Sequence, residues 1–476
     1  MTKAGKKQKH WGRFILISLC FLSFFIGCQN KDSEEYIRNR VKSIEALGKI
    51  KSEETVDKLI KIYKNKDESF IVRNVAAKIL AKMKSKKTVE VFKHTLKEGE
   101  FEVEIAAVEA LGEIKSKKAV EALIKAIKHD DFWVQSAAIE ALLKIKPKKA
   151  VEPLIGALND KDYSVRLMAA KALGVFKAKK SVRPLIHALK DEESIVRSAA
   201  AEALKEIGSE EVVQQLIHIF EDKNESITVR GIAAMTLGKL KSGKALKSFR
   251  KALKEEDTDI RLKIVAALKE MNTEKSIDIL IELTRHKDFP VQRDAIYALD
   301  MLKSEKAVEA LVNCLKDKNY IIRGMSAKAL GAIESEKVVI PLIKALKDEN
   351  SKVRIAAAKA FRYRYIKSEK AVTALVQALK DENSSVRIET AKTLGVIKPG
   401  KAVIPLIQAL KDKDHQVRGT AAEALGFIKS VKAIEPLTAA LKDDYYFVRA
   451  QAKTALIQNL VDHGLKQFIS FAVRFL

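Results

Sequence analysis

One pattern of apolar and polar positions recurs along nearly the whole chain. It can be aligned on the position that Arg166 occupies in the stretch Ser-Val-Arg-Leu-Met-Ala-Ala-Lys-Ala-Leu-Gly, which we call the reference position. Apolar residues fall one residue before it and three, seven and ten residues after it, which places them on one face of a helix. A second apolar stripe, Ala150 to Leu158 in the same repeat, comes before it. Each repeat is therefore predicted to be two antiparallel helices.

The repeat has a nearly constant length. The reference position recurs fourteen times, ten of the thirteen intervals are 31 residues and three are 33, and it is Arg in eleven cases. The three departures are Glu104, Gln135 and Gln292. Neither helix of a pair can bury its apolar face alone, so neighbouring repeats must stack around one continuous core. The predicted fold is all-α, an α-solenoid of stacked helix pairs.

The repeat consensus, A-V-x-P-L-I-x-A-L-x-D followed by V-R-x-x-A-A-x-A-L-G, resembles the HEAT-like repeats of the phycobilisome-lyase type. The resemblance covers residues 33–460, a half repeat followed by thirteen full repeats of 31–33 residues. It implies a structural ladder between adjacent repeats, formed by the reference Arg and an Asp six residues before it. That Asp also lies near the free backbone N–H groups that begin the second helix. The ladder residues are Asp160, Arg166, Asp191, Arg197, Asp317, Arg323, Asp348, Arg354, Asp381, Arg387, Asp412, Arg418, Asp443 and Arg449.

The N-terminal segment departs from the repeat. A basic stretch precedes an apolar run from Phe14 to Ile26, which is too short to span a bilayer comfortably. The run ends Phe25-Ile26-Gly27-Cys28, which resembles the lipobox of bacterial lipoproteins. The resemblance implies a signal peptide over residues 1–27, a lipid-modified Cys28 and a short tether over residues 28–32. An ordinary signal peptide or short anchor is the alternative.

Lipidation would place the protein in the cell envelope, anchored to a membrane and facing the periplasm or the surface. Gln29 favours the outer membrane in an organism that has one. Residues 461–476 abandon the repeat and are predicted to cap the last repeat or to dock elsewhere.

Charge adds a candidate surface. The 476 residues include 89 Lys and Arg against 62 Asp and Glu, a net charge of +27. Lysine pairs recur between successive repeats and are predicted to form a stripe along one edge: Lys86, Lys87, Lys117, Lys118, Lys148, Lys149, Lys179 and Lys180. The stripe either keeps the protein soluble or attracts anionic lipid, a polyanion or an acidic partner. A nucleic acid partner is not expected, because aromatic residues do not interleave with these lysines.

One repeat carries an insertion. Where the others read Leu-Gly-x-Ile, it reads Phe361 followed by Arg362, Tyr363, Arg364 and Tyr365. Arginine and tyrosine are enriched in interface hot spots, so these four residues are a candidate partner-binding site. A tolerated insertion is the alternative.

Catalytic signatures are missing from the sequence. The eight His include no pair at the spacing of a helical metal site, and the His-Glu dipeptides with which a related iron hydroxylase binds its metal do not occur. Cys314 replaces an Ala of the first-helix stripe and is predicted to be buried. We therefore expect no cofactor, no metal and no enzymatic activity. The predicted function is a membrane-anchored scaffold that binds a protein or other macromolecule. The alternatives are a bilin-lyase-like enzyme and a charge-driven adaptor on an anionic membrane or polyanion.

Overall fold

The computed structural model describes residues 31–362 and 368–462, and every regular element within them is helical. The chain divides between residues 207 and 208 into two compact units, which we describe separately. The described part of the first unit contains α2 (Lys31–Gly48), α3 (Glu53–Lys64), α4 (Phe70–Met83), α5 (Lys86–Glu98), α6 (Phe101–Ile114), α7 (Lys117–Ala126), α8 (Phe132–Ile145), η1 (Lys148–Ala150), α9 (Val151–Ala157), α10 (Tyr163–Val175), η2 (Lys179–Ser181), α11 (Val182–Ala188) and α12 (Ser194–Ile207).

The second unit continues the same alternation. Its described elements are α13 (Glu210–Glu221), α14 (Ile227–Lys239), α15 (Ala245–Glu255), α16 (Thr258–Met271), α17 (Glu274–Leu283), α18 (Phe289–Leu302), η3 (Glu305–Ala307), α19 (Val308–Cys314), α20 (Tyr320–Ala332), η4 (Glu336–Val338), α21 (Val339–Ala345), α22 (Ser351–Ala360), α23 (Glu369–Ala378), α24 (Ser384–Ile397), η5 (Gly400–Ala402), α25 (Val403–Ala409), α26 (His415–Ile428), η6 (Val431–Ala433), α27 (Ile434–Ala440) and α28 (Tyr446–Asp462).

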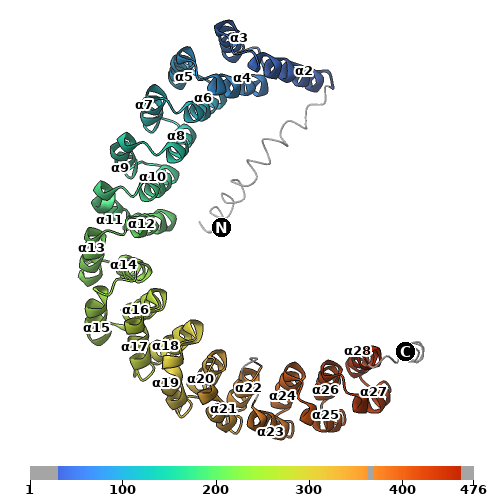
Figure 1. Cartoon of the computed structure of the whole chain (residues 1–476). Coiled ribbons are helices and arrows are strands. Elements are labelled where there is room, and N and C mark those ends of the chain that lie inside the picture. Colours follow the sequence, from blue (N-terminus) through green and yellow to red (C-terminus); the bar gives the residue numbers. More distant parts are fainter. Residues whose placement is uncertain (1–30, 363–367, 463–476) are drawn as a thin grey trace, which may run out of the picture. The chain divides into compact units, whose positions relative to one another are not determined.

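Within each unit the helices form two rows. Even-numbered helices stack on one another in the inner row, and odd-numbered helices form the outer row (Figure 1). The apolar residues around the reference position are buried between the rows, as Val165, Ala169 and Leu173 show in α10 with no exposed surface. The predicted all-α solenoid is confirmed.

Local sequence determines where the inner helices begin and end. Asp162 caps α10 and Asn350 caps α22, each accepting a hydrogen bond from the backbone N–H two residues further on. At the other end of most inner helices the chain leaves the helix through one residue in the left-handed conformation. Outside glycine, all such residues in the described chain are lysines except Asn272: Lys84, Lys115, Lys146, Lys177, Lys241, Lys303, Lys398 and Lys429. Glycine is the usual residue at this position, since a side chain there costs about 1 kcal/mol.

Glycines eight residues after the reference position let successive inner helices approach closely. A Cβ placed on Gly174 would lie 2.7 Å from Cα of Ala203, and one on Gly331 would lie 2.5 Å from Cβ of Ala360. Both distances are too short for a real contact. The Leu-Gly of the repeat therefore sets how tightly the inner row stacks.

Candidate functional site

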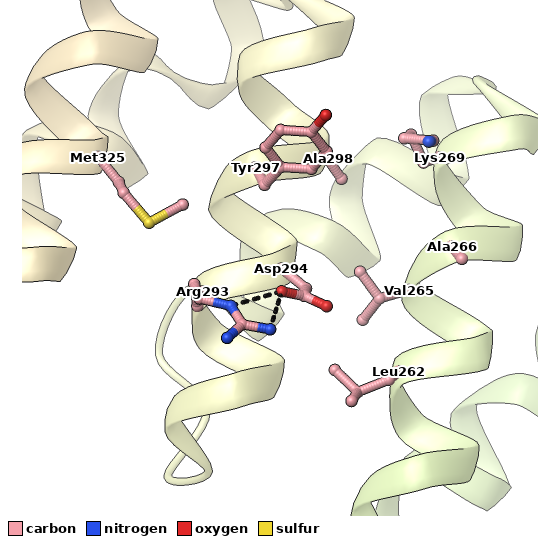
Figure 2. A pocket seen from close by; sticks show the side chains of 9 residues that line it. All are labelled: Leu262, Val265, Ala266, Lys269, Arg293, Asp294, Tyr297, Ala298 and Met325. Atoms are coloured by element: carbon pink, nitrogen blue, oxygen red, sulfur yellow. Dashed lines mark hydrogen bonds and ion pairs between the residues drawn. The ribbon is translucent and has the colours of Figure 1, made fainter.

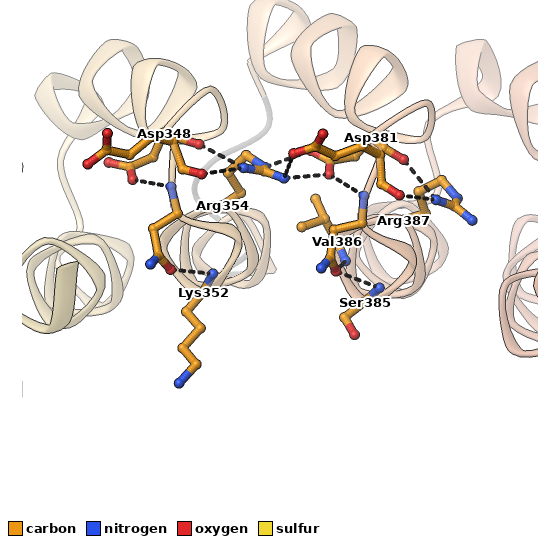
Figure 3. A network of polar contacts seen from close by, with 11 residues as sticks. Asp348, Lys352, Arg354, Asp381, Ser385, Val386 and Arg387 are labelled. Atoms are coloured by element: carbon orange, nitrogen blue, oxygen red, sulfur yellow. Dashed lines mark hydrogen bonds and ion pairs between the residues drawn. The ribbon is translucent and has the colours of Figure 1, made fainter.

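Buried ion pairs connect neighbouring repeats along one edge of the stack. Arg354 donates from Nε and Nη2 to the two carboxylate oxygens of Asp381, both at 2.8 Å (Figure 3). Its Nη1 donates to the carbonyl oxygens of Asp348 and Glu349 in its own turn. The same arrangement joins Arg166 to Asp191, Arg323 to Asp348, Arg387 to Asp412 and Arg418 to Asp443. One guanidinium thus fixes its own turn and that of the next repeat.

The Asp of each pair also organises the turn before the inner helix. Asp381 accepts a hydrogen bond from the backbone N–H of Asn383, and the Asn383 side chain accepts from Ser385 N (Figure 3). The ladder Asp therefore lies two residues before the residue that caps the helix.

Other predicted ladder residues have different partners. Asp160 accepts from Gln135 and Asp317 accepts from Gln292, so a glutamine at the reference position keeps the connection without a charge. Arg197 and Arg449 donate to carbonyl oxygens of their own turns: Arg197 to Asp191 and Glu192, and Arg449 to Asp443 and Asp444.

The environment of the ladder carboxylates favours their charged form. The pKa of Asp443 is lowered, chiefly by the hydrogen bonds from Arg418, although burial opposes this. For Asp191, burial alone would raise the pKa, but the Arg166 hydrogen bonds and the Glu193 backbone N–H outweigh it and the pKa is lowered. In the five pairs, side-chain exposure is at most 14%. These residues are fully engaged inside the protein, and their role is structural.

The eight lysines of the predicted stripe are all exposed. They lie at the beginnings of α5 and α7, and in η1 and η2 directly before α9 and α11. Three of them reach back to an acid on the preceding outer helix: Lys87 to Asp57 at 3.2 Å, Lys118 to Glu90 at 3.3 Å and Lys180 to Glu152 at 3.4 Å. The remaining five, Lys86, Lys117, Lys148, Lys149 and Lys179, make no ion pair with any described residue.

These exposed ion pairs form a second set of connections between repeats, which was not predicted from the sequence. It continues in the second unit, where Lys244 pairs with Glu210, Lys306 with Glu274, and Lys401 with Glu369. The signal was present, because an acid recurs near the start of most outer helices, about one repeat before each lysine.

Of the predicted insertion site, the structure describes only Arg362. Its guanidinium forms an ion pair with Glu389 of α24, and its Nε lies 3.3 Å from Oγ1 of Thr393. Phe361 beside it is fully buried. Arg362 is therefore bound to the next repeat, whereas the sequence suggested that it is presented to a partner. Tyr363, Arg364 and Tyr365 lie outside the described residues, as do Cys28, the predicted signal peptide and residues 463–476.

The described residues contain no group of three or more His, Cys, Asp or Glu placed to hold a metal ion. Cys314 is buried, as predicted, and burial raises the pKa of its thiol. Among residues 31–362 and 368–462, no helix is both long and apolar enough to cross a bilayer.

An apolar groove lies on the inner face of the second unit. It has a volume of about 450 Å³ and runs across α16, α18 and α20 (Figure 2). Leu262, Val265 and Ala266 line it on one side, Met325 lines it on the other, and Tyr297 stands at one end (Figure 2). Tyr297 is 48% exposed, and Met301, one turn further along α18, is 56% exposed.

The polar groups of the groove neutralise one another. Arg293 donates from Nε to Asp294 at 2.7 Å, and the pair lies at the floor between α16 and α20 (Figure 2). Nζ of Lys269 lies 3.6 Å from Oε1 of Glu270 and forms an ion pair with it. The groove therefore offers apolar surface together with charges that already have partners.

The sequence of the inner helices also changes near this groove. The residue five positions after the reference position lies at the centre of the exposed inner face, because a helix turns 100° per residue. In the first unit it is always Glu or Lys: Glu45, Lys78, Glu109, Glu140, Lys171 and Glu202. In α14, α16 and α18 it is Met235, Ala266 and Tyr297. Two of these three uncharged residues, Ala266 and Tyr297, line the groove, and Met235 lies on the inner helix before it.

The folded repeats and their ladder define an α-solenoid held together by contacts between nearest neighbours. A sequence profile of HEAT repeats matches seven overlapping stretches: 30–103, 92–167, 151–228, 222–300, 281–362, 339–416 and 372–457. The chain belongs to the HEAT-repeat family. This match does not show the finer resemblance, to the phycobilisome-lyase type. A search of curated proteins finds no match.

Solved structures share the fold. The crystal structure of Kap121p matches with a TM-score of 0.57 at 13% identity, over 95% of this chain and 58% of that one. Kap121p bound to Ste12p matches with a TM-score of 0.55 at 14% identity, over 94% and 53% of the two chains. A structure of the karyopherin Kap121p bound to the extreme C-terminus of the phosphatase Cdc14p gives 0.54 at 14% identity, over 94% and 55%. The chain thus spans little more than half the length of these relatives, and the likeness shows the fold.

Proposed function

We propose that this protein is a membrane-anchored, non-catalytic scaffold that binds a protein partner on the inner face of its solenoid. The observation that carries the proposal is the groove across α16, α18 and α20, where Leu262, Val265 and Met325 line apolar surface. Beside them stands Tyr297, which is 48% exposed at a position that is Glu or Lys in every inner helix of the first unit. Exposed apolar surface of this kind is typical of protein interaction sites.

Two further observations support a binding role. The recurring Arg and Asp residues of the repeat are bound to one another in the ladder, so the side chains left for a binding function lie on exposed surfaces. Solved structures with this fold show Kap121p bound to Ste12p, to Nup53p and to the C-terminus of Cdc14p. In those complexes a solenoid of this fold binds other proteins.

Membrane anchoring rests on the lipobox-like Phe25-Ile26-Gly27-Cys28. Acylation of Cys28 would leave only Gln29 and Asn30 before α2, a tether of roughly 10 Å, so the first unit would begin at the membrane surface of the cell envelope. The unpaired lysines of the outer edge, Lys148 and Lys149 among them, would then add attraction to anionic lipid or another polyanion.

Crosslinking capture of the full-length protein from native membranes tests the proposal. At moderate salt we expect one stoichiometric protein partner, which a Tyr297→Ala variant should retain less well. Capture of lipid or polyanion alone, lost as salt rises, would replace the scaffold with a charge-driven adaptor. Recovery of the chain in the soluble fraction with residues 1–27 intact would overturn the anchor. Turnover of a bilin or formation of a chromophore adduct would overturn the non-catalytic assignment.

A further inference from the structure

The inner face of the second unit changes character along the stack. Five residues after the reference position, α14, α16 and α18 carry Met235, Ala266 and Tyr297, and the next three inner helices carry lysines. These are Lys328 in α20, Lys359 in α22 and Lys392 in α24. In no other part of the described chain does this row hold three consecutive residues of one charge. An apolar stretch is thus followed by a cationic one on the same surface.

The three lysines are exposed, and acids beside them are already engaged. Lys328 pairs with Asp300 at 2.7 Å. Glu389, which lies near Lys392 in α24, is bound by Arg362 and is only 16% exposed. Lys359 and Lys392 themselves have no ion-pair partner among the described residues. The positive charges of Lys359 and Lys392 are therefore available to a ligand.

The spacing of the row matches an extended peptide. Packed helices are about 10 Å apart, and an extended chain in the polyproline-II conformation advances about 3.1 Å per residue with three residues per turn. One repeat therefore corresponds to roughly three residues, and every third side chain lies on the same face of the peptide. A segment lying along the row would meet one lysine at every third residue. Two carboxylates three residues apart would face Lys359 and Lys392 in turn.

We infer that the inner face from α14 to α24 binds an extended protein segment that has an apolar side chain at one end and acidic residues at every third position beyond it. The apolar side chain enters the groove beside Tyr297, and the carboxylates pair with the lysines. This inference rests on the proposed function and specifies the partner: an acidic peptide segment with an aromatic or aliphatic anchor. The apolar groove alone would not distinguish one partner from another. The positively charged lysines would favour acidic segments over neutral or basic ones.

Selection of random 16-residue peptides displayed on phage, with the immobilised full-length protein as bait, tests the inference. We expect enriched peptides to carry an aromatic or aliphatic residue followed by Asp or Glu at three-residue spacing. Enrichment of basic or uncharged peptides, or of none, would overturn the inference.

Binding of an enriched peptide, followed by fluorescence anisotropy, separates the site from general electrostatics. Lys359→Glu combined with Lys392→Glu should weaken binding about tenfold or more, because two attractions become repulsions. The matched control is Lys344→Glu with Lys370→Glu, which changes the net charge equally on the exposed surface of the outer helices α21 and α23, and it should stay within about twofold. Equal loss in both double variants would show that net charge alone drives binding and would overturn the inference.

Two results distinguish the inference from the proposed function. If membrane capture retains a stoichiometric protein partner whose binding does not respond to Lys359→Glu with Lys392→Glu, the scaffold stands and the acidic-segment inference fails. If no protein partner is retained, the proposed function fails. Circular dichroism of each variant confirms folding, since all four lysines are exposed and their replacement leaves the core intact.

Discussion

Removing one arginine of the buried ladder should destabilise its own repeat and the next one. In the Arg354→Met variant, Asp381 would lose both hydrogen bonds from the guanidinium, and the carbonyl oxygens of Asp348 and Glu349 would lose their donor. Both partners of the ion pair are 8–10% exposed, so the carboxylate left behind would stay desolvated. Breaking a buried pair from one side costs roughly 3–5 kcal/mol. Because Asp381 keeps the Asn383 backbone N–H, we expect the lower end, about 3 kcal/mol.

Hydrogen exchange measures this loss where it occurs. Solenoid repeats interact mainly with their neighbours, so the free energy of opening should fall for amides of α22 and α24 and change less in helices further away. Lys359→Met on the same helix is the control, because Lys359 is exposed and unpaired, and its cost should stay within about 0.5 kcal/mol. Adding Asp381→Asn to Arg354→Met should recover about 1 kcal/mol or more, since the isolated charge is removed. The reasoning is refuted if Arg354→Met costs no more than the control, or if the double variant loses the sum of the two single losses.

Four further changes have outcomes that follow from the contacts described. The stabilisation from Asp443, whose pKa is lowered mainly by Arg418, should be complete above about pH 5 and should be lost as the pH falls through the folded-state pKa; urea titrations from pH 7 to pH 3 should show a smaller loss in Arg418→Met. Lys115→Gly should raise the unfolding free energy by up to about 1 kcal/mol, read from the thermal midpoint, because Lys115 has a φ of 55°. Gly331→Val should cost about 1–3 kcal/mol in the same assay, because its side chain would press on the next inner helix; wild-type stability would contradict the close approach. Native protein should leave Cys314 unmodified by iodoacetamide, as mapped by mass spectrometry, and denatured protein should not, because the thiol is buried and its pKa is raised.

Much of the fold could be predicted because the solenoid is a local structure repeated many times. The offsets around Arg166 identify one face of one helix, and their recurrence identifies the stacking. The Asp and Arg spacing also indicated contacts such as Arg354 with Asp381, because the repeat fixes both residues relative to the same turn.

The exceptions depend on side-chain reach rather than on register. Arg40 binds Glu68 although Asp67 occupies the repeated Asp position, and Gln135 takes over the connection to Asp160. Arg362 was expected at an exposed bulge, but α22 ends at Ala360 and directs it to Glu389. None of these three contacts follows from periodicity, since several rotamers of a long side chain satisfy the same spacing.

The groove could have been found from the sequence by a different comparison. The apolar offsets describe what is buried in every repeat, whereas function depends on what differs among the exposed positions. Ala266 and Tyr297, which are uncharged where every inner helix of the first unit has Glu or Lys, line the groove. Its volume required the structure, because it depends on side chains from three helices.

The exposed Lys–acid pairs of the outer row would resist bending of each unit through ionic attraction. Each pair spans two adjacent outer helices, as Lys401 to Glu369 and Lys306 to Glu274 do, so bending that spreads the outer row stretches these pairs while the buried Arg–Asp pairs keep adjacent turns in register. Salt screens exposed ion pairs and weakens them, whereas buried ion pairs are screened much less. Ionic strength would thus adjust how readily each stack of repeats flexes without loosening the register of its turns.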